Sequence, residues 1–376
     1  MNRVVMISGF VLAFLQGGPS IFSQDTLDTG NKLQFYSDFR FRAEHDWNSR
    51  GANGVLRPDR FRLRYRARFG FNFQWSNQIE FGARLRTGSL LNQQSPHITL
   101  GDEFQEGAIG IDKAFIRGAH DKMWWWLGKN TFPFWKQNEL WWDDDINPGG
   151  VALGWRLPAG DQFSLKPSIG YFIIRDTTID ESYLIAVQIA AEAELAKMKL
   201  SFASGFFGFN NMRYRPDQQS WTLDYDILHS GVKMEFESFT GVTLGVDYLL
   251  NLKNYGSIHD IPERLRNQID GFVGSLSLGG LDKKGDFMVA YTYAQIGNFS
   301  VVDYLAQDDW VRWGFANAPG TRSSNFKGHE VKTAYAFGTT FNAVFRIYFV
   351  QGMVPPDEQS IRETGNRFRM DLNVKF

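Results

Sequence analysis

The sequence lacks cysteine, since none of its 376 residues is one. A disulfide framework, a thiolate metal site, a cysteine nucleophile and a lipid-modified N-terminal cysteine are therefore excluded. Net charge is nearly absent too, because 40 Lys and Arg residues offset 41 Asp and Glu residues to a formal -1. A chain this close to neutral offers no electrostatic argument for a nucleic-acid partner. Its motifs predict no metal site and no cofactor.

Long apolar runs are missing as well, and none after the N-terminal region reaches the ~18 residues of a transmembrane helix. The one apolar run covers residues 4–15, directly after Arg3, and residues 17–20 end it. A run this short is typical of a signal peptide, so we expect residues 1–23 to be removed and residues 24–376 to form one domain. The alternative is a buried N-terminal helix, which the lack of a following amphipathic segment disfavours.

Aromatic residues are abundant, at 16% with 34 Phe, although the mean hydropathy is only -0.31. This combination fits strands that have one apolar face and one wet face. The alternation is clearest in residues 60–75, where a strand collects the apolar side chains on one face and a helix would scatter them. The apolar face consists of Phe61, Leu63, Tyr65, Ala67, Phe69, Phe71, Phe73 and Trp75.

The same alternation predicts sixteen strands and is weakest in residues 108–119, 123–130 and 149–157. Short and long connections alternate between the strands, which is typical of short periplasmic turns and longer extracellular loops. We therefore predict an all-β fold, a transmembrane antiparallel β-barrel of about 16 strands. A soluble sandwich or propeller is disfavoured by the strand lengths and by the lack of a repeat. The predicted strands are 33–45, 59–75, 78–87, 108–119, 123–130, 149–157, 163–175, 182–194, 196–209, 221–238, 241–252, 267–279, 285–297, 328–337, 341–351 and 366–376.

Nine arginines share the polar face of the first three predicted strands, and we call them the arginine wall. Because neighbouring strands lie ~4.8 Å apart, the wall concentrates positive charge, and we predict that it lines a pore and attracts anions. The alternative is that these arginines only pair with inner-face carboxylates such as Asp38, Glu44 and Glu80. The arginine wall consists of Arg40, Arg42, Arg60, Arg62, Arg64, Arg66, Arg68, Arg84 and Arg86.

Three adjacent carboxylates, Asp143, Asp144 and Asp145, occupy the predicted long connection 131–148. If this connection folds inward, the carboxylates oppose the arginine wall and form a constriction with a transverse field. A solvated acidic surface loop is one alternative. A calcium site is another, although the central Gly and terminal Glu of a calcium-binding loop are absent.

Aromatic clusters and histidines complete the candidates. We interpret the aromatic residues at strand ends as a bilayer-interface girdle, with a sugar-stacking track as the alternative. None of the six histidines lies in a catalytic motif, so the sequence predicts no enzyme, although a hydrolase dyad needs no local motif. The aromatic clusters are Trp124, Trp125, Trp126, Phe132, Phe134 and Trp135, and later Trp310, Trp313 and Phe315.

Several phrases of the sequence resemble a family of bacterial outer-membrane porins. They are D-R-F-R-L-R-Y-R-A-R-F-G-F at 59–71, L-R-T-G at 85–88, W-D-D-D-I-N-P-G-G-V-A at 142–152, Y-T-Y at 291–293 and N-F-K-G-H-E-V-K-T-A-Y at 325–335. Phe376 on the final alternating strand is similar to the signal that barrel-assembly machinery recognises.

The resemblance implies a pore of about sixteen strands in the bacterial outer membrane, often a homotrimer, through which small hydrophilic solutes diffuse. Its lipid-facing side contacts outer-membrane lipid. Sugar-export porins have similarly arginine-rich lumens, so a selective channel or exporter for acidic sugars or polysaccharide is the second interpretation. An outer-membrane hydrolase is the third.

Overall fold

The computed structural model describes residues 32–101, 106–177, 180–213, 222–237, 241–259, 261, 263–311, 323–355 and 358–376. The predicted signal peptide, residues 1–23, lies outside the described residues.

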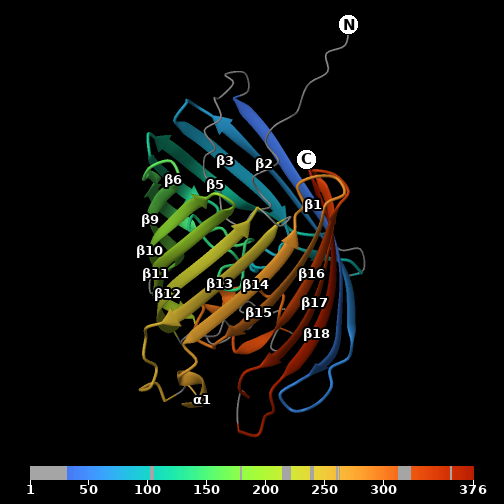
Figure 1. Ribbon diagram of the computed structural model, residues 1–376. Coiled ribbons are helices and arrows are strands. Elements are labelled where there is room, and N and C mark those ends of the chain that lie inside the picture. The colour runs from blue at the N-terminus through green and yellow to red at the C-terminus, as the bar shows by residue number, and fades with distance from the viewer. Residues whose placement is uncertain are drawn as a thin grey trace.

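The described chain forms one antiparallel sheet that closes on itself, with 16 long strands and two strands of two residues, β4 (Ile98–Thr99) and β8 (Leu157–Pro158) (Figure 1). The only regular α-helix among the described residues is the short α1 (Glu263–Arg266). The long strands are β1 (Leu33–Arg50), β2 (Arg60–Gln74), β3 (Ile79–Thr87), β5 (Ile109–His120), β6 (Met123–Lys129), β7 (Gly149–Trp155), β9 (Phe163–Thr177), β10 (Asp180–Leu195), β11 (Met198–Arg213), β12 (Thr222–Phe236), β13 (Val242–Asn251), β14 (Asp270–Gly279), β15 (Phe287–Ile296), β16 (Phe326–Ala336), β17 (Phe341–Gly352) and β18 (Thr364–Lys375).

The predicted fold class is confirmed, and each predicted strand corresponds to one long strand. The weakest prediction, residues 108–119, has a physical explanation. Arg84 pairs with Lys113 but Leu85 pairs with Ile111, so Asp112 is the extra residue of a β-bulge. Asp112 and Lys113 are consequently both buried, and the period of two is broken at this point.

Closure of the barrel depends on β1, which pairs with β2 on one side and with β18 on the other. A closed sheet satisfies the backbone N–H and C=O groups between strands and leaves no edge exposed to lipid. No helix among the described residues is long and apolar enough to cross a bilayer.

The two ends of the barrel differ. The C-terminus lies at the end of the short turns, and α1, in the long connection after β13, lies at the opposite end (Figure 1). The short-turn end is the periplasmic one, as in other barrels of this kind. One connection breaks the alternation of short turns and long loops. Strand β9 ends at Thr177 and β10 already begins at Asp180, so this connection is short although it lies at the long-loop end.

The outer face of the barrel is apolar and exposes aromatic rings beside the short turns. These rings form the interfacial girdle that a membrane barrel needs at the headgroup level. They include Trp75, Phe81, Trp155, Phe163, Phe287, Phe337 and Phe341.

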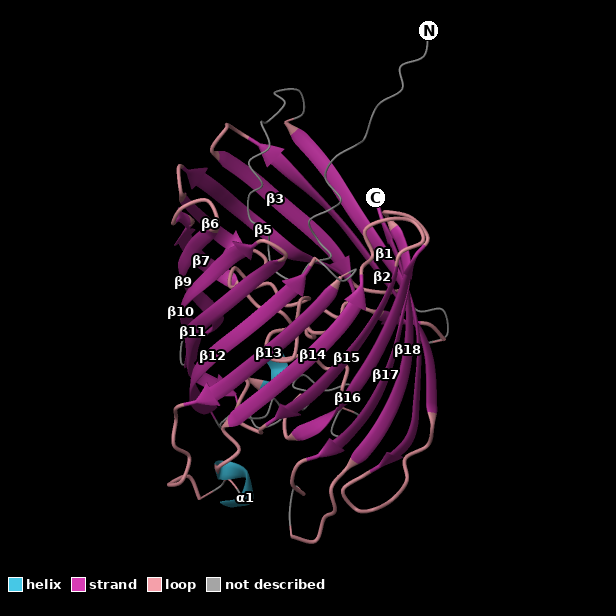
Figure 2. Cartoon of the chain, in the orientation of Figure 1, coloured by secondary structure: helices cyan, strands magenta, loops and turns pink. Residues whose placement is uncertain are grey.

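The two sides of the inner face differ in composition. Inward residues of β1, β2, β3 and β18 are charged, whereas those of β10 to β17 include fully buried apolar residues such as Leu184, Phe207 and Leu249. Loop segments lie inside the ring of strands and cover this apolar side (Figure 2). The expectation of a wet, polar inner face is therefore wrong for this half, because two connections fold inward and bury it.

We predict that an arginine introduced on the outer face destabilises the barrel far more than an arginine introduced at the neighbouring inward position. Leu276 in β14 faces outward and is exposed, whereas Ser277 faces inward. Leu276→Arg places a cation in lipid and should destabilise the barrel by about 2–4 kcal/mol if it lies near the midplane. Ser277→Arg, the matched control, should cost much less. The measurement is the free energy of unfolding in lipid vesicles. An equal loss of stability in both variants would contradict the assignment of Leu276 to the outer face and Ser277 to the inner face.

Candidate functional site

The arginine wall contains like charges that face each other across neighbouring strands. The register of β1 and β2 places Arg40 opposite Arg66 and Arg42 opposite Arg64. Like charges directly opposite each other destabilise a sheet unless counter-ions lie nearby. The carboxylates that fill this role come from the strands themselves and from two inward-folded connections.

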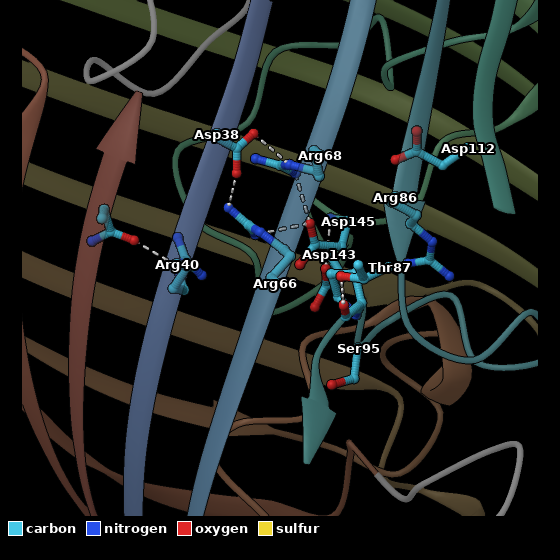
Figure 3. Close-up of polar contacts among 12 residues, drawn as sticks. Asp38, Arg40, Arg66, Arg68, Arg86, Thr87, Ser95, Asp112, Asp143 and Asp145 are labelled. Carbon is cyan, nitrogen blue, oxygen red and sulfur yellow. Dashed lines mark hydrogen bonds and ion pairs between the residues drawn. The ribbon is translucent and has the colours of Figure 1, made fainter. Parts of the chain in front are cut away.

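Two of the carboxylates of β1, Asp38 and Glu44, each bind two arginines of β2. Asp38 accepts hydrogen bonds from Arg68 at 2.7 Å and Arg66 at 2.9 Å (Figure 3). Glu44 lies 2.7 Å from Arg62 and 3.5 Å from Arg64. Pairing of the wall with inner-face carboxylates, the alternative raised from the sequence, thus occurs at Asp38 and Glu44. Glu80 instead binds Arg117, outside the wall.

The seam between β1 and β18 supplies further pairs that the sequence reasoning did not include. Arg42 lies 2.6 Å from Asp371, and Arg367 lies 2.6 Å from Asp46. Asp46 also binds Arg60 at 2.7 Å, and Asp371 binds Arg369 at 3.0 Å. Arg367 and Arg369 therefore extend the positive face onto the last strand. Closure of the barrel could have revealed this, because it makes the alternating last strand a neighbour of the first.

The remaining wall arginines have different partners. Arg84 forms a buried ion pair with Asp112 at 2.6 Å. Arg40 donates to the side-chain oxygen of Asn373 at 2.6 Å, and within the described chain no carboxylate lies within 4.0 Å of it. Arg86 donates to backbone carbonyls, including that of Asn92 at 2.8 Å, and so holds the segment after β3 against the wall. The wall thus carries positive charge that direct ion pairs do not cancel.

The connection between β6 and β7 crosses the interior of the barrel. The backbone N–H of Trp135 donates to Gln188 in β10 at 2.7 Å. The side chain of Gln137 donates to the carbonyls of Val232 in β12 and Val246 in β13, at 3.1 and 2.7 Å. Since β12 lies halfway round the ring from β2, this part of the connection rests on the side opposite the arginine wall.

The same connection then returns to the wall at Asp145, whose carboxylate lies 3.0 Å from Arg68 and 3.3 Å from Arg66 (Figure 3). Asp143 is buried, and its carboxylate accepts the backbone N–H of Asp145 at 2.7 Å. Asp144 differs from both, because its side chain is 63% exposed and pairs with Lys136.

These different environments shift the pKa values of the acids in opposite directions. Burial and the neighbouring Glu139 raise the pKa of Asp143, so its neutral form is favoured. Burial alone would raise the pKa of Asp145, but Arg66 and Arg68 outweigh it and lower this pKa. The three carboxylates are directed at different partners, so they do not converge on one cation as a calcium site requires. Within the described ranges no cluster of three or more His, Asp or Glu side chains could hold a metal.

A second acidic connection, between β15 and β16, was missed by the sequence reasoning. Its Asp309 binds Arg369 and lies 3.6 Å from Arg42 and 3.7 Å from Arg367. The two connections hold each other, since Asp143 N–H donates to the carbonyl of Leu305 at 2.8 Å. The available signal was the pair Asp308 and Asp309 beside Trp310, which resembles the acidic phrase next to Trp142.

The aromatic clusters lie mostly inside the barrel. Trp126, Phe132, Phe134 and Trp310 are almost fully buried in one apolar cluster, and the ring centroids of Phe132 and Trp142 are 4.1 Å apart. The girdle interpretation is therefore wrong for these residues, because Trp126 faces inward from β6 and the connections bring the other rings inward to cover the apolar half. Trp313 and Phe315 lie outside the described residues.

One His–Asp pair could suggest hydrolysis. His229 Nε2 lies 2.8 Å from Asp247, and both side chains are buried. The ring of Trp141 stacks on His229 with a centroid distance of 4.6 Å, and Asn138 donates to Asp247. In the described structure no hydroxyl nucleophile contacts the other ring nitrogen of His229. The pair therefore anchors the connection between β6 and β7 to β12 and β13.

A closed barrel with short turns at one end and an inward-folded connection is the architecture of the outer-membrane porins, and comparisons agree. The chain aligns over 92% of its length with 94% of Pseudomonas putida OprB in a high-pH structure, with a TM-score of 0.57 and 8% identity. For Salmonella typhi OmpF in complex with daunomycin the TM-score is 0.55 at 14% identity, over 92% and 98% of the chains. For a loop-deletion mutant of OmpT, an outer membrane protein of Vibrio cholerae, the TM-score is 0.50 at 12% identity, over 92% and 99%.

Identities this low establish the fold alone. The sequence adds an independent similarity, since residues 55–237, just under half of the chain, match the family model described as "Putative porin". Over this stretch the chain is similar to a porin family, and its barrel has the fold of the porins to which it was compared. No curated protein sequence matches it.

The packing of the inward connection should depend on pH through Glu139. Burial and next Asp144 raise the pKa of Glu139 from 4.5 to about 8. Because the folded pKa lies above the unfolded one, the stability contributed by neutral Glu139 is complete below pH 4.5 and is lost as pH rises through about 8. Amide exchange in residues 140–147, corrected for its intrinsic rate, should therefore accelerate across this pH.

The matched variants isolate the cause. Glu139→Gln resembles the neutral acid and should remove the acceleration, whereas Glu363→Gln, in another long connection, should leave it unchanged. Exchange that accelerates equally in Glu139→Gln would contradict the assignment.

Proposed function

We propose that the protein is a passive channel for small hydrophilic solutes, with its narrowest section at the level where the acidic connection that carries Asp144 and Asp145 crosses the interior to the arginine wall. The observation that carries the proposal is the path of this connection. It rests on β12 and β13, crosses the interior, and meets Arg66 and Arg68 on the other side. We infer that solutes pass beside this contact, along other arginines of the wall and the exposed carboxylate of Asp144.

The charge arrangement supports weak anion selectivity. Arg40 and Arg86 bind neutral oxygen atoms, so their charge contributes to the field inside the barrel. Asp144 contributes an exposed negative charge from the loop side, partly offset by Lys136. Opposite charges across a narrow passage orient dipolar solutes and discriminate between ions.

A catalytic role has less support than transport. The His229–Asp247 pair is buried beneath Trp141 and binds the inward connection through Asn138. We therefore propose a channel that carries out no reaction and needs no cofactor.

The partners stay predictions. Phe376 is 74% exposed at the periplasmic end, and its backbone N–H donates to Ser37 at 2.9 Å. A ring presented in this way supports recognition by barrel-assembly machinery. The homotrimer and the cleavage of residues 1–23 likewise stay predictions.

Two substitutions at one contact test the function. Arg66→Gln removes a positive charge and should shift the reversal potential in a salt gradient towards cation selectivity. Asp145→Asn removes the negative charge that Arg66 and Arg68 share, and should shift the reversal potential towards anion selectivity. The measurement is single-channel recording in planar bilayers.

Each variant serves as the control for the other. If the substitutions only loosened the connection, the reversal potentials of both variants would shift in the same direction. Absence of any conductance in the parent protein would refute the channel, and shifts of the same sign would refute the charged constriction.

A further inference from the structure

A cavity of about 190 Å³ lies against the arginine wall. Its lining comes from β2, β18, the segment between β3 and β5, and the connection that carries Asp308. Asp145 is not among its lining residues, so it is separate from the constriction. We call it the wall pocket. It has room for several water molecules, yet it is smaller than the ~300–1,000 Å³ typical of drug-sized sites.

The cationic side of the wall pocket has unused donors. Arg62 binds Glu44 through one terminal nitrogen, and Arg64 binds Glu44 and Ser95 through both of its terminal nitrogens. The Nε atoms of both arginines are buried, and within the described chain neither has a hydrogen-bond partner. A guanidinium edge that keeps its Nε–H suits the oxygen atoms of a carboxylate.

His97 provides an independent observation. It lines the pocket and is only 7% exposed, and among the described residues neither of its ring nitrogens has a partner. Buried polar groups in folded proteins are nearly always hydrogen-bonded, so an imidazole with two unused nitrogens indicates a ligand. Burial and next Arg42 lower the pKa of His97, so the ring is neutral and offers one donor and one acceptor.

Other lining residues of the wall pocket are suited to hydroxyl groups. Ser95, Thr99 and Asn92 contribute hydroxyl and amide groups, and Asp308 contributes a carboxyl group. These groups both donate and accept hydrogen bonds, as the hydroxyls of a sugar do. A simple inorganic anion would use the arginines and leave these groups unused.

We propose that the wall pocket binds a small hydroxylated carboxylate, a monosaccharide acid of the uronate class, with its carboxylate on Arg62 and Arg64 and its hydroxyls on His97, Asp308 and their neighbours. This inference rests on the proposed function only for the route of the ligand, which reaches the pocket through the interior of the barrel.

Isothermal titration of the folded protein in detergent tests the ligand class, with glucuronate, glucose and inorganic phosphate as probes. Glucuronate should bind, and glucose should bind about tenfold more weakly or less, because it lacks the charge-assisted bonds. Equal binding of glucose would overturn the proposal, since the arginines would then contribute nothing. Phosphate binding as tight as that of glucuronate would also overturn it, since the groups suited to hydroxyls would then be idle.

Matched variants test the location. Arg62→Gln should weaken glucuronate binding about tenfold, whereas Arg60→Gln, two residues away on the same face but outside the pocket, should leave it unchanged. His97→Ala should weaken binding as well, and His120→Ala, at a periplasmic turn, should not. Equal effects of a pocket variant and its control would overturn the assignment. If an arginine variant fails to fold, the comparison of His97→Ala with His120→Ala provides the test.

Failure of this inference differs from failure of the proposed function. Conductance in planar bilayers without glucuronate binding would refute the wall pocket and leave the channel intact. Binding without conductance would refute the channel and leave the wall pocket.

Discussion

The structure depends on one constraint, that a sheet facing lipid must pair every backbone polar group. The chain meets it by bringing β18 back to β1, which closes the ring. Closure and the strict alternation of β2 together force the arginines of neighbouring strands onto one inner surface, with Arg40 facing Arg66 and Arg42 facing Arg64. The charge crowding on this surface is thus a consequence of how the barrel satisfies its backbone.

Crowded cations need counter-ions, and the long connections provide those that the strands do not. Asp145 reaches Arg66 and Arg68 from one connection, and Asp309 reaches Arg42 and Arg369 from another. The same connections bury apolar rings against β10 to β17. Hydrophobic burial on one side and ion pairing on the other therefore hold the connections across the interior of the barrel.

The sequence predicts the parts of this arrangement that are set locally. Period-two alternation identifies every long strand, because each strand must present one face to lipid. The muddled pattern near Asp112 follows from a bulge that no local period reveals. Asp309, His97 and the inward rings of Phe132 and Phe134 could not be placed, because their positions depend on contacts between segments far apart in the chain. The girdle interpretation failed for the same reason, since composition does not distinguish a ring facing lipid from one facing inward.

The central claim is that the connection carrying Asp144 lies in the path of the permeating ions. The chain has no cysteine, so Asp144→Cys provides a single reactive thiol at an exposed position of this connection. The direct measurement is single-channel current while a bulky, positively charged thiol reagent modifies that position. The account predicts a large stepwise fall in current, and no fall when Glu358→Cys, exposed in the connection before β18, is modified in the same way. Complete modification of Asp144→Cys with unchanged current would contradict the claim.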